Sequence, residues 1–203
     1  MVQLYILLGK GNTKMVSLYI FDMGGVVCNN FRDIPLISKE LGIKEEEFFI
    51  YAGENFQTLL EGKIDSREFW KRFSQSLGKY IGEDLFKKYF HPQLNLEVIE
   101  IIKQLKKFSR VVCGSNTLDT HYNYLANRGA YNIFDRVYVS NKIGFSKPDA
   151  NFFWHILREE KTKPADTVFI DDLEENILAA RKIGINSILF TNPDSLKQQI
   201  KIL

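Results

Sequence analysis

The chain has 203 residues, of which 45% are hydrophobic and 26% are charged, a balance typical of a soluble globular protein. Its 27 basic and 25 acidic side chains leave a formal net charge of +2, which gives no large field to recruit nucleic acid or an anionic membrane. The length suffices for one core domain with a smaller inserted subdomain. We therefore expect neither a nucleic-acid partner nor a membrane partner, and the oligomeric state stays open.

Two cysteines, Cys28 and Cys113, bear on the expected redox environment. They show no CxxC spacing and no secretory signal precedes them, so they are interpreted as reduced, buried thiols. No neighbouring histidine makes Cys28 a candidate nucleophile. We therefore expect a cytoplasmic protein.

Residues 1–14 precede the first element of the expected core. Val2–Leu8 is a short apolar run without basic residues ahead of it, and Gly9–Asn12 interrupts the pattern. The run is too short to span a membrane and lacks the layout of a signal peptide. Two interpretations stay open. Either translation begins at Met15 and residues 1–14 are an extension, or these residues form an extra edge strand.

A hydrophobic run, Leu18–Phe21, predicts the first strand of the core, and it ends in Asp22. Gly24 and Gly25 follow, and glycines at such a turn let backbone N–H groups approach a phosphate closely. An aspartate that merely starts a turn is the ordinary alternative. This segment alone does not decide between the two.

Residues 31–90 show little strand signal and several helical patterns. An apolar stripe over Ile34–Leu41 ends at Gly42, and Asp65 with Glu68 resembles a capping box ahead of a second stripe. We therefore expect a small helical cap inserted after the first strand.

From residue 91 onward, helices and strands alternate along the chain. The expected strands are 110–113, 137–139, 167–170 and 187–190, and the expected helices are 96–107, 119–128, one opened by Pro148, and 174–183. Such alternation predicts an α/β fold, a doubly wound parallel sheet with helices on both faces.

Further polar residues follow these strands. Ser115 and Asn116 stand just after the strand at 110–113, and Lys147 precedes Pro148 further along the chain. Open α/β sheets place their sites at the carboxyl ends of the strands. A turn with a helix cap would by itself explain Ser115 and Asn116, and an exposed lysine would explain Lys147.

Asp171 and Asp172 form the most specific single motif, because adjacent carboxylates at the end of a buried strand repel each other unless a cation joins them. Mg²⁺ prefers hard oxygen ligands, usually one or two carboxylates with water and phosphate. Together with Asp22, the pair indicates a magnesium-assisted phosphoryl-transfer centre. Asn176 either orients one of these carboxylates or is an ordinary residue of the first helical turn.

The order and spacing of Asp22, Ser115, Lys147 and Asp171–Asp172 resemble the haloacid dehalogenase (HAD) superfamily, over nearly the whole chain from about residue 17. The resemblance implies three segments: an N-terminal extension, a Rossmann-like core and an inserted helical cap, at residues 1–14, 15–30 with 91–203, and 31–90.

By this resemblance, Asp22 is the nucleophile that attacks phosphorus and forms an aspartyl phosphate. Ser115 would donate a hydrogen bond to a phosphoryl oxygen, and Asn116 would line the pocket beside it. Gly25 would belong to the substrate-binding loop. Lys147 would neutralise charge on both Asp22 and the phosphate.

The same resemblance implies a Mg²⁺ cofactor held by Asp22, by the backbone carbonyl of Gly24 and by Asp172. Asp171 would then act on the metal through water. The sequence does not rank Asp171 against Asp172, and both stay candidate ligands.

Gly24 departs from the pattern, because many HAD phosphatases carry a second aspartate at that position. That aspartate protonates the leaving oxygen, and its loss removes an acid–base contribution of about 10²–10⁴-fold. Substrates whose leaving group needs little protonation, such as a sugar 1-phosphate or an acyl phosphate, should then be favoured.

A bacterial subgroup that resembles α-D-glucose-1-phosphate phosphatases also carries glycine at this position. Its cap contains stretches similar to Gly53–Phe56 and Glu61–Ile64 here. The resemblance assigns substrate selection to the segment Glu54–Glu61, with Glu54 as a candidate substrate-binding residue.

The expected function is therefore a magnesium-dependent phosphatase for a small phosphorylated metabolite. A metal-free haloacid dehalogenase is disfavoured by the acidic pair, and a phosphomutase by the missing acid–base group. Gly24 permits a catalytically silent sensor of a phosphorylated ligand. The histidines have no ligand spacing and receive no role: His91, His121 and His155.

Overall fold

A five-stranded parallel sheet forms the centre of the molecule. The computed structural model describes residues 5–8 and 12–200, with side chains from residue 16 onward. The strand order is β7-β6-β3-β8-β9, and every neighbouring pair is parallel. The strands are β3 (Leu18–Phe21), β6 (Arg110–Ser115), β7 (Arg136–Val139), β8 (Thr167–Asp171) and β9 (Asn186–Leu189).

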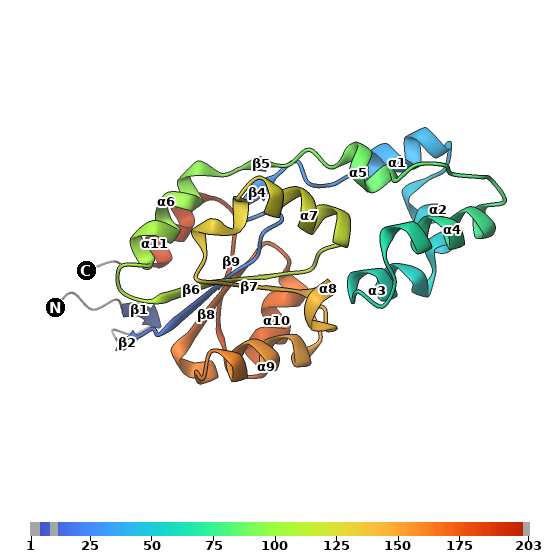
Figure 1. Cartoon of the computed structure of the whole chain (residues 1–203). Helices are drawn as coiled ribbons and strands as arrows, with labels where there is room; N and C mark the ends of the chain where they lie inside the picture. The colour runs from blue at the N-terminus through green and yellow to red at the C-terminus, as the bar shows by residue number, and fades with distance from the viewer. Residues whose placement is uncertain (1–4, 9–11, 201–203) are drawn as a thin grey trace.

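Helices cover both faces of this sheet, as Figure 1 shows. Alternate residues of β3 serve the two sides: Tyr19 and Phe21 belong to one buried cluster, and Leu18 and Ile20 to the other. The first cluster includes side chains of α6 (Leu96–Leu105), α7 (Asp119–Asn127) and α11 (Pro193–Gln199), and the second those of α9 (Ala150–Glu159) and α10 (Glu174–Lys182). The α/β doubly wound fold that the alternation predicts is confirmed.

Short elements complete the core between these strands and helices. They are the 3₁₀ turns η1 (Ala130–Ile133) and η2 (Pro164–Asp166) and the four-residue helix α8 (Ser140–Ile143), which follows β7 directly.

Five helices between residues 34 and 89 form a helical insertion with an apolar cluster of its own. They are α1 (Ile34–Leu41), α2 (Glu45–Ala52), α3 (Glu54–Leu60), α4 (Ser66–Leu77) and α5 (Leu85–Tyr89). Aromatic rings fill this cluster: the Phe48 and Phe73 ring centroids lie 5.0 Å apart, and those of Trp70 and Phe86 lie 4.7 Å apart.

The two chain segments that lead into and out of the helical insertion pair with each other. β4 (Cys28–Asn29) and β5 (Gln93–Leu94) form a two-stranded antiparallel ribbon in which Cys28 lies opposite Leu94. The sequence does not predict this ribbon, because strands this short leave no alternation of polar and apolar residues to detect.

Helix ends follow the expected capping residues at most positions. Gly42 ends α1 in the left-handed conformation, with φ at +75°, and the Asp65 carboxylate accepts a hydrogen bond from the Glu68 N–H at the start of α4. Pro148 does not open α9. Asp149 is the N-cap and accepts a hydrogen bond from the Asn151 N–H at 2.8 Å, so the first helical residue is Ala150.

The N-terminal segment forms a hairpin of its own. β1 (Tyr5–Leu8) and β2 (Asn12–Met15) pair antiparallel in a sheet separate from the central one. The expectation of an extra edge strand is therefore wrong for the described part of this segment, and residues 1–4 and 9–11 lie outside the described residues. A start of translation at Met15 stays a prediction. The described helices include none with the length and apolar character that a membrane span requires.

Cys28 and Cys113 are buried and free, as expected. Burial, with the nearby charges of Asp22 and Asp172, raises the pKa of the Cys28 thiol to about 12, and burial raises the pKa of Cys113 well above its usual range. Both side chains are therefore protonated, unreactive thiols near neutral pH.

Candidate active site

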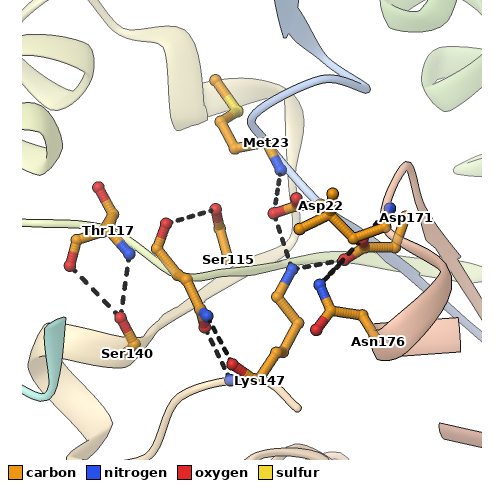
Figure 2. A network of polar contacts seen from close by, with 10 residues as sticks. Asp22, Met23, Ser115, Thr117, Ser140, Lys147, Asp171 and Asn176 are labelled. Atoms are coloured by element: carbon orange, nitrogen blue, oxygen red, sulfur yellow. Dashed lines mark hydrogen bonds and ion pairs between the residues drawn. The ribbon is translucent and has the colours of Figure 1, made fainter. Parts of the chain in front are cut away.

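Three strands of the sheet end at the same edge and deliver the polar residues there. β3 lies between β6 and β8, with Phe21 level with Cys113 on one side and with Ile170 on the other. The residues that follow these positions therefore meet at the carboxyl edge, where parallel sheets of this kind carry their sites. Figure 2 shows this group of side chains around Asp22.

Lys147 is the centre of the polar network. Its Nζ lies 2.9 Å from Oδ1 of Asp22 and 2.7 Å from Oδ2 of Asp171 (Figure 2). All three residues are buried, with exposed fractions of 4%, 7% and 0% for Lys147, Asp22 and Asp171. A charged group this deep in a protein needs a partner of opposite charge. Here the Lys147 ammonium is the partner of both carboxylates, and the carboxylates are the partners of the ammonium.

The surroundings of Asp22 raise the pKa of its carboxyl group toward neutral pH. Burial raises the pKa of Asp22 to about 6, while the Lys147 charge opposes that rise and the Asp171 charge adds to it. Burial also lowers the pKa of Lys147, but Asp22 and Asp171 outweigh it, so the net direction is upward. Lys147 therefore stays a cation where Asp22 is an anion.

Asp171 is fixed by hydrogen bonds to both of its carboxylate oxygens. Oδ1 accepts from the Leu173 N–H at 2.8 Å and from Nδ2 of Asn176 at 3.0 Å, and Oδ2 accepts from Asn176 at 3.1 Å and from Lys147. Asn176 is 2% exposed and belongs to α10, so its position is set by the helix that follows β8. Of its two possible roles, the orienting contact with Asp171 is present.

Asp172 differs from Asp171 in that its side chain is partly exposed. Burial and the Asp171 charge raise its pKa. Asp22, Asp171 and Asp172 each present one carboxylate oxygen, and these oxygens lie within 4.8 Å of one another. Three carboxylates against one ammonium leave excess negative charge, and oxygen donors at this spacing fit a small hard cation such as Mg²⁺.

The loop after Asp22 is a tight turn closed by backbone hydrogen bonds. The Met23 N–H donates to Oδ1 of Asp22 at 2.7 Å, and the Cys28 N–H donates to the Met23 carbonyl at 2.8 Å. Gly25 has φ at +77°, and a Cβ there would lie 2.1 Å from Oδ2 of Asp172. This position therefore requires glycine both for its backbone and for the room it leaves to a carboxylate.

Gly24 is restricted by a ring and not by its backbone angle. A Cβ at this position would lie 3.1 Å from two atoms of the Phe31 side chain, closer than side chains normally pack. Phe31 thus fills the space into which a side chain at position 24 would point. No pattern in the sequence singles out this phenylalanine.

Asn116 connects the end of β6 to the Lys147 backbone. Its Nδ2 donates to the Lys147 carbonyl and its Oδ1 accepts from the Lys147 N–H, both at 2.8 Å. Ser115 is 3% exposed, its hydroxyl donates to the Asn116 carbonyl at 3.3 Å, and its presence beside Asp22 lowers the pKa of that carboxylate. Both residues therefore lie beside the Asp22–Lys147 pair. Asn116 contacts the backbone of Lys147 and not its ammonium group.

The helical insertion touches the loop that carries Lys147. Nε2 of Gln57, on α3, donates to Oγ of Ser146 at 2.7 Å. Next to it, a Cβ at Gly62 would lie 2.0 Å from the Asn141 carbonyl oxygen, so the two backbones are in close contact. Neither contact has a signature that sequence reasoning could detect.

The structure brings together all but one of the residues expected at the site. Glu54 is exposed at the start of α3, and no described contact joins its side chain to the others. The others surround Asp22 at the edge of the sheet: Gly24, Gly25, Ser115, Asn116, Lys147, Asp171 and Asp172.

Comparison with known proteins gives full-length relatives. A D-ribitol-5-phosphate phosphatase from Bacteroides thetaiotaomicron is 23% identical over 203 aligned positions, covering 93% of this chain and 98% of that protein. The sesquiterpene phosphatase astK of Aspergillus oryzae is 25% identical and covers 85% of this chain and 89% of its own. A third relative, drimenol cyclase drtB of Aspergillus calidoustus, is 36% identical over 70 residues, and the match spans 13% of its length.

A HAD family enzyme from Bacteroides thetaiotaomicron, solved with magnesium and inorganic phosphate, has the same fold, with a TM-score of 0.71 and 22% identity over 85% of this chain and 93% of that one. Residues 19–190 match the family described as haloacid dehalogenase-like hydrolases. This match covers the central sheet except for Leu18, the helical insertion and every residue of the candidate site. The chain belongs to the haloacid dehalogenase-like hydrolase family.

Proposed function

We propose that the protein is a Mg²⁺-dependent phosphatase that hydrolyses a small phosphorylated metabolite through an aspartyl phosphate on Asp22. The observation that carries this proposal is the cluster of three carboxylates within 4.8 Å beside the buried Lys147. Two full-length relatives are named as phosphatases, and a structure with the same fold was solved with magnesium and phosphate.

The metal would be held by Asp22, by the backbone carbonyl of Gly24 and by Asp172. Asp171 is the weaker candidate for a direct ligand, because both of its oxygens already accept hydrogen bonds from Leu173, Asn176 and Lys147. We assign it to holding Lys147 and to contacting the metal through water. When bound, Mg²⁺ supplies positive charge that neutralises phosphoryl oxygens.

The side chains of this protein account for the two chemical steps. Asp22 forms an O–P bond as the bond from phosphorus to the leaving oxygen breaks, and that oxygen departs with the bonding electrons. Water then attacks phosphorus as the bond from phosphorus to the Asp22 oxygen breaks. The bonding electrons restore the Asp22 carboxylate, and the protons of the water leave with phosphate or pass to solvent. Lys147 and the Met23 N–H hold Oδ1 of Asp22, which fixes the direction from which the carboxylate attacks. Ser115 would donate to a phosphoryl oxygen.

The helical insertion would act as a cap, within the division into core (15–30 and 91–203) and cap (31–90) that the resemblance implies. The Gln57 contact with Ser146 supports this role, because it joins α3 to the loop of the catalytic lysine. Asn116 and Gly25 would line the phosphate pocket. Glu54, exposed at the start of α3, would be a further substrate-binding residue of this cap.

The absence of an acid at Gly24 limits the substrates, because charge on the departing oxygen must be borne by the leaving group or by water. A sugar 1-phosphate meets this condition and is the class that the sequence resemblance favours. A silent sensor of a phosphorylated ligand is the second candidate, and the Phe31 ring against Gly24 favours it, because that ring occupies the place of a proton donor.

Phosphate release from sugar phosphates, nucleotides and acyl phosphates, measured with Mg²⁺ and with EDTA, tests the proposal. We expect activity that EDTA removes and Mg²⁺ restores, and none in Asp22→Asn, whose amide has the same shape but cannot attack phosphorus. Asp194→Asn, an exposed carboxylate on α11, is the matched control. Full activity in EDTA would exclude the metal assignment. Ligand binding without any phosphate release would favour the sensor.

A further inference from the structure

A cavity of about 320 Å³ lies between the helical insertion and the core. Its volume is at the lower end of the roughly 300–1,000 Å³ found for small-molecule sites. The helices of the insertion contribute rings and aliphatic side chains to its wall, among them Phe49, Phe56, Leu60 and Phe86. The core contributes Leu118, and the segment that leads into the insertion contributes Phe31.

This cavity adjoins the candidate active site. Phe31 is the ring that lies against Gly24, two residues after Asp22, and Asn116 in the same wall is bonded to the Lys147 backbone. Arg32 also lines it, and its charge is one of those that lower the pKa of Asp172. A phosphate held at Asp22 would therefore lie close to this space.

The buried and partly buried polar side chains in the wall have partners within the protein. Asn116 exchanges two hydrogen bonds with the Lys147 backbone. Nε2 of His121 lies 2.9 Å from Oδ2 of Asp33, and the Thr117 hydroxyl donates to the Leu118 carbonyl at 3.4 Å. Arg32 and Glu45 are exposed at the rim. A polyol needs a hydrogen-bonding partner for each buried hydroxyl, and this wall provides few, so burying a sugar here would be costly.

On the basis of the proposed phosphatase function, we propose that this cavity binds an apolar leaving group, aromatic or branched aliphatic, so that the substrate is a phosphate of an apolar compound. This substrate class differs from the sugar 1-phosphate that the sequence resemblance favours. Phe49 is the residue best suited to a test, because its ring is 49% exposed and packs edge-on against Phe56 with centroids 5.6 Å apart. A bound apolar group would cover this exposed ring.

The experiment compares benzoyl phosphate with acetyl phosphate, whose leaving carboxylates are of similar acidity and differ in the ring. Phosphate release is measured with Mg²⁺ and corrected for spontaneous hydrolysis. In the wild type, kcat/KM for benzoyl phosphate should exceed that for acetyl phosphate by at least about tenfold. In Phe49→Asn this ratio should fall about tenfold, whereas Phe49→Leu, which keeps an apolar side chain, should retain most of it.

Ile50→Asn is the matched control, because Ile50 is the next residue on α2, is 74% exposed and does not line the cavity. It should leave the ratio unchanged, which separates loss of the apolar wall from weakening of the helix. Equal kcat/KM for the two acyl phosphates, or a ratio that Phe49→Asn does not change, would overturn the inference. Higher kcat/KM for glucose 1-phosphate than for 1-naphthyl phosphate would do the same.

A binding measurement separates this inference from the proposed function. Isothermal titration calorimetry with 1-naphthol, which carries no phosphate, should show binding to the wild type that Phe49→Asn weakens and Ile50→Asn does not. If neither acyl phosphate is hydrolysed but 1-naphthol binds in this way, the phosphatase proposal fails and the apolar site stands. If both acyl phosphates are hydrolysed equally and 1-naphthol does not bind, the phosphatase proposal stands and the apolar site fails.

Discussion

The Lys147 ammonium and the Asp171 carboxylate form a 2.7 Å ion pair that is closed off from solvent. Asp171 is itself held by Leu173 and Asn176, so it is a fixed anchor for the lysine. Breaking one side of such a pair leaves an uncompensated buried charge. Asp171 therefore holds the Lys147 ammonium in the position from which it also contacts the Asp22 carboxylate.

Replacing Lys147 with alanine should separate catalysis from metal binding. The site would lose its buried cation and keep three carboxylates, so Mg²⁺ should bind more tightly while kcat/KM for any hydrolysed phosphate falls by orders of magnitude. Metal affinity is measured by titration calorimetry and turnover by phosphate release. Lys103→Ala, on the exposed side of α6, should change neither. Unchanged kcat/KM in Lys147→Ala would mean that the lysine is only structural.

Gly25→Ala should inactivate the site through a steric clash, and Gly42→Ala is the control that shows the effect of backbone strain alone. Gly25 and Gly42 have nearly the same backbone angle, with φ at +77° and +75°, but a Cβ at Gly42 meets nothing within 4 Å. Gly42→Ala should therefore cost only the left-handed strain, about 1–2 kcal/mol of the free energy of unfolding.

Gly25→Ala adds a clash with the Asp172 carboxylate at 2.1 Å and should also abolish Mg²⁺-dependent activity. Urea denaturation and phosphate release on both variants check this. Equal activity in the two variants would show that Asp172 does not need its present position.

Rates should depend steeply on the leaving group, since no carboxylic acid stands at position 24. Over a series of aryl and alkyl phosphates, kcat/KM should rise as the pKa of the leaving group falls. Gly24→Asp should flatten this dependence by speeding the poorest leaving groups by up to about 10²-fold, provided that the new side chain fits.

The Phe31 ring decides that fit, because a Cβ at position 24 lies 3.1 Å from it. The test variant is therefore Gly24→Asp combined with Phe31→Leu, and Phe31→Leu alone is its control. A wild type that hydrolyses phenyl and alkyl phosphates at nearly equal rates, with chemistry rate-limiting, would contradict this prediction.

The raised pKa of Asp22 has a consequence for stability in the absence of metal. Its folded-state pKa of about 6 exceeds the ordinary value of about 3.9, so burying the ionised group destabilises the fold fully above pH 6. This penalty disappears as the pH falls through 6 toward 4, where the folded protein keeps a proton that the unfolded chain has lost.

Asp22→Asn should therefore be more stable than the wild type at pH 8, by up to about 3 kcal/mol, and should lose this advantage toward pH 4. Urea denaturation in EDTA at pH 4.5, 6 and 8 measures the difference between the two proteins. Asp194→Asn should show no such trend, because that side chain is 82% exposed. A difference that grows toward low pH would refute the assignment.

Sequence reasoning located the strands and the main site residues because both leave strong local signals. Short apolar runs such as Leu18–Phe21 are typical of buried strands, and the runs that precede Asp22 and Asp171 each lead to a carboxylate that is unfavourable in an apolar core without a partner. Parallel pairing then brings Asp22 and Asp171 together without further information. The α/β fold could therefore be derived from the sequence.

The remaining features depend on contacts between residues far apart in the chain. The Phe31 ring against Gly24, the Gln57 contact with Ser146 and the cavity between insertion and core arise only when two segments meet. Pro148 illustrates a local failure, because proline fits the first turn of a helix but Asp149 provided the stronger cap. Whether Glu54 contacts substrate stays a prediction.

The β4–β5 ribbon has a consequence for the history of the chain. Because Asn29 and Gln93 face each other as neighbours in a ladder, the helical insertion leaves and rejoins the core at points about 5 Å apart. A gain, loss or exchange of everything between them asks for no rearrangement of the central sheet. The whole insertion can therefore be exchanged as a unit during evolution. Such an exchange would change the substrate preference and leave the catalytic residues of the core in place.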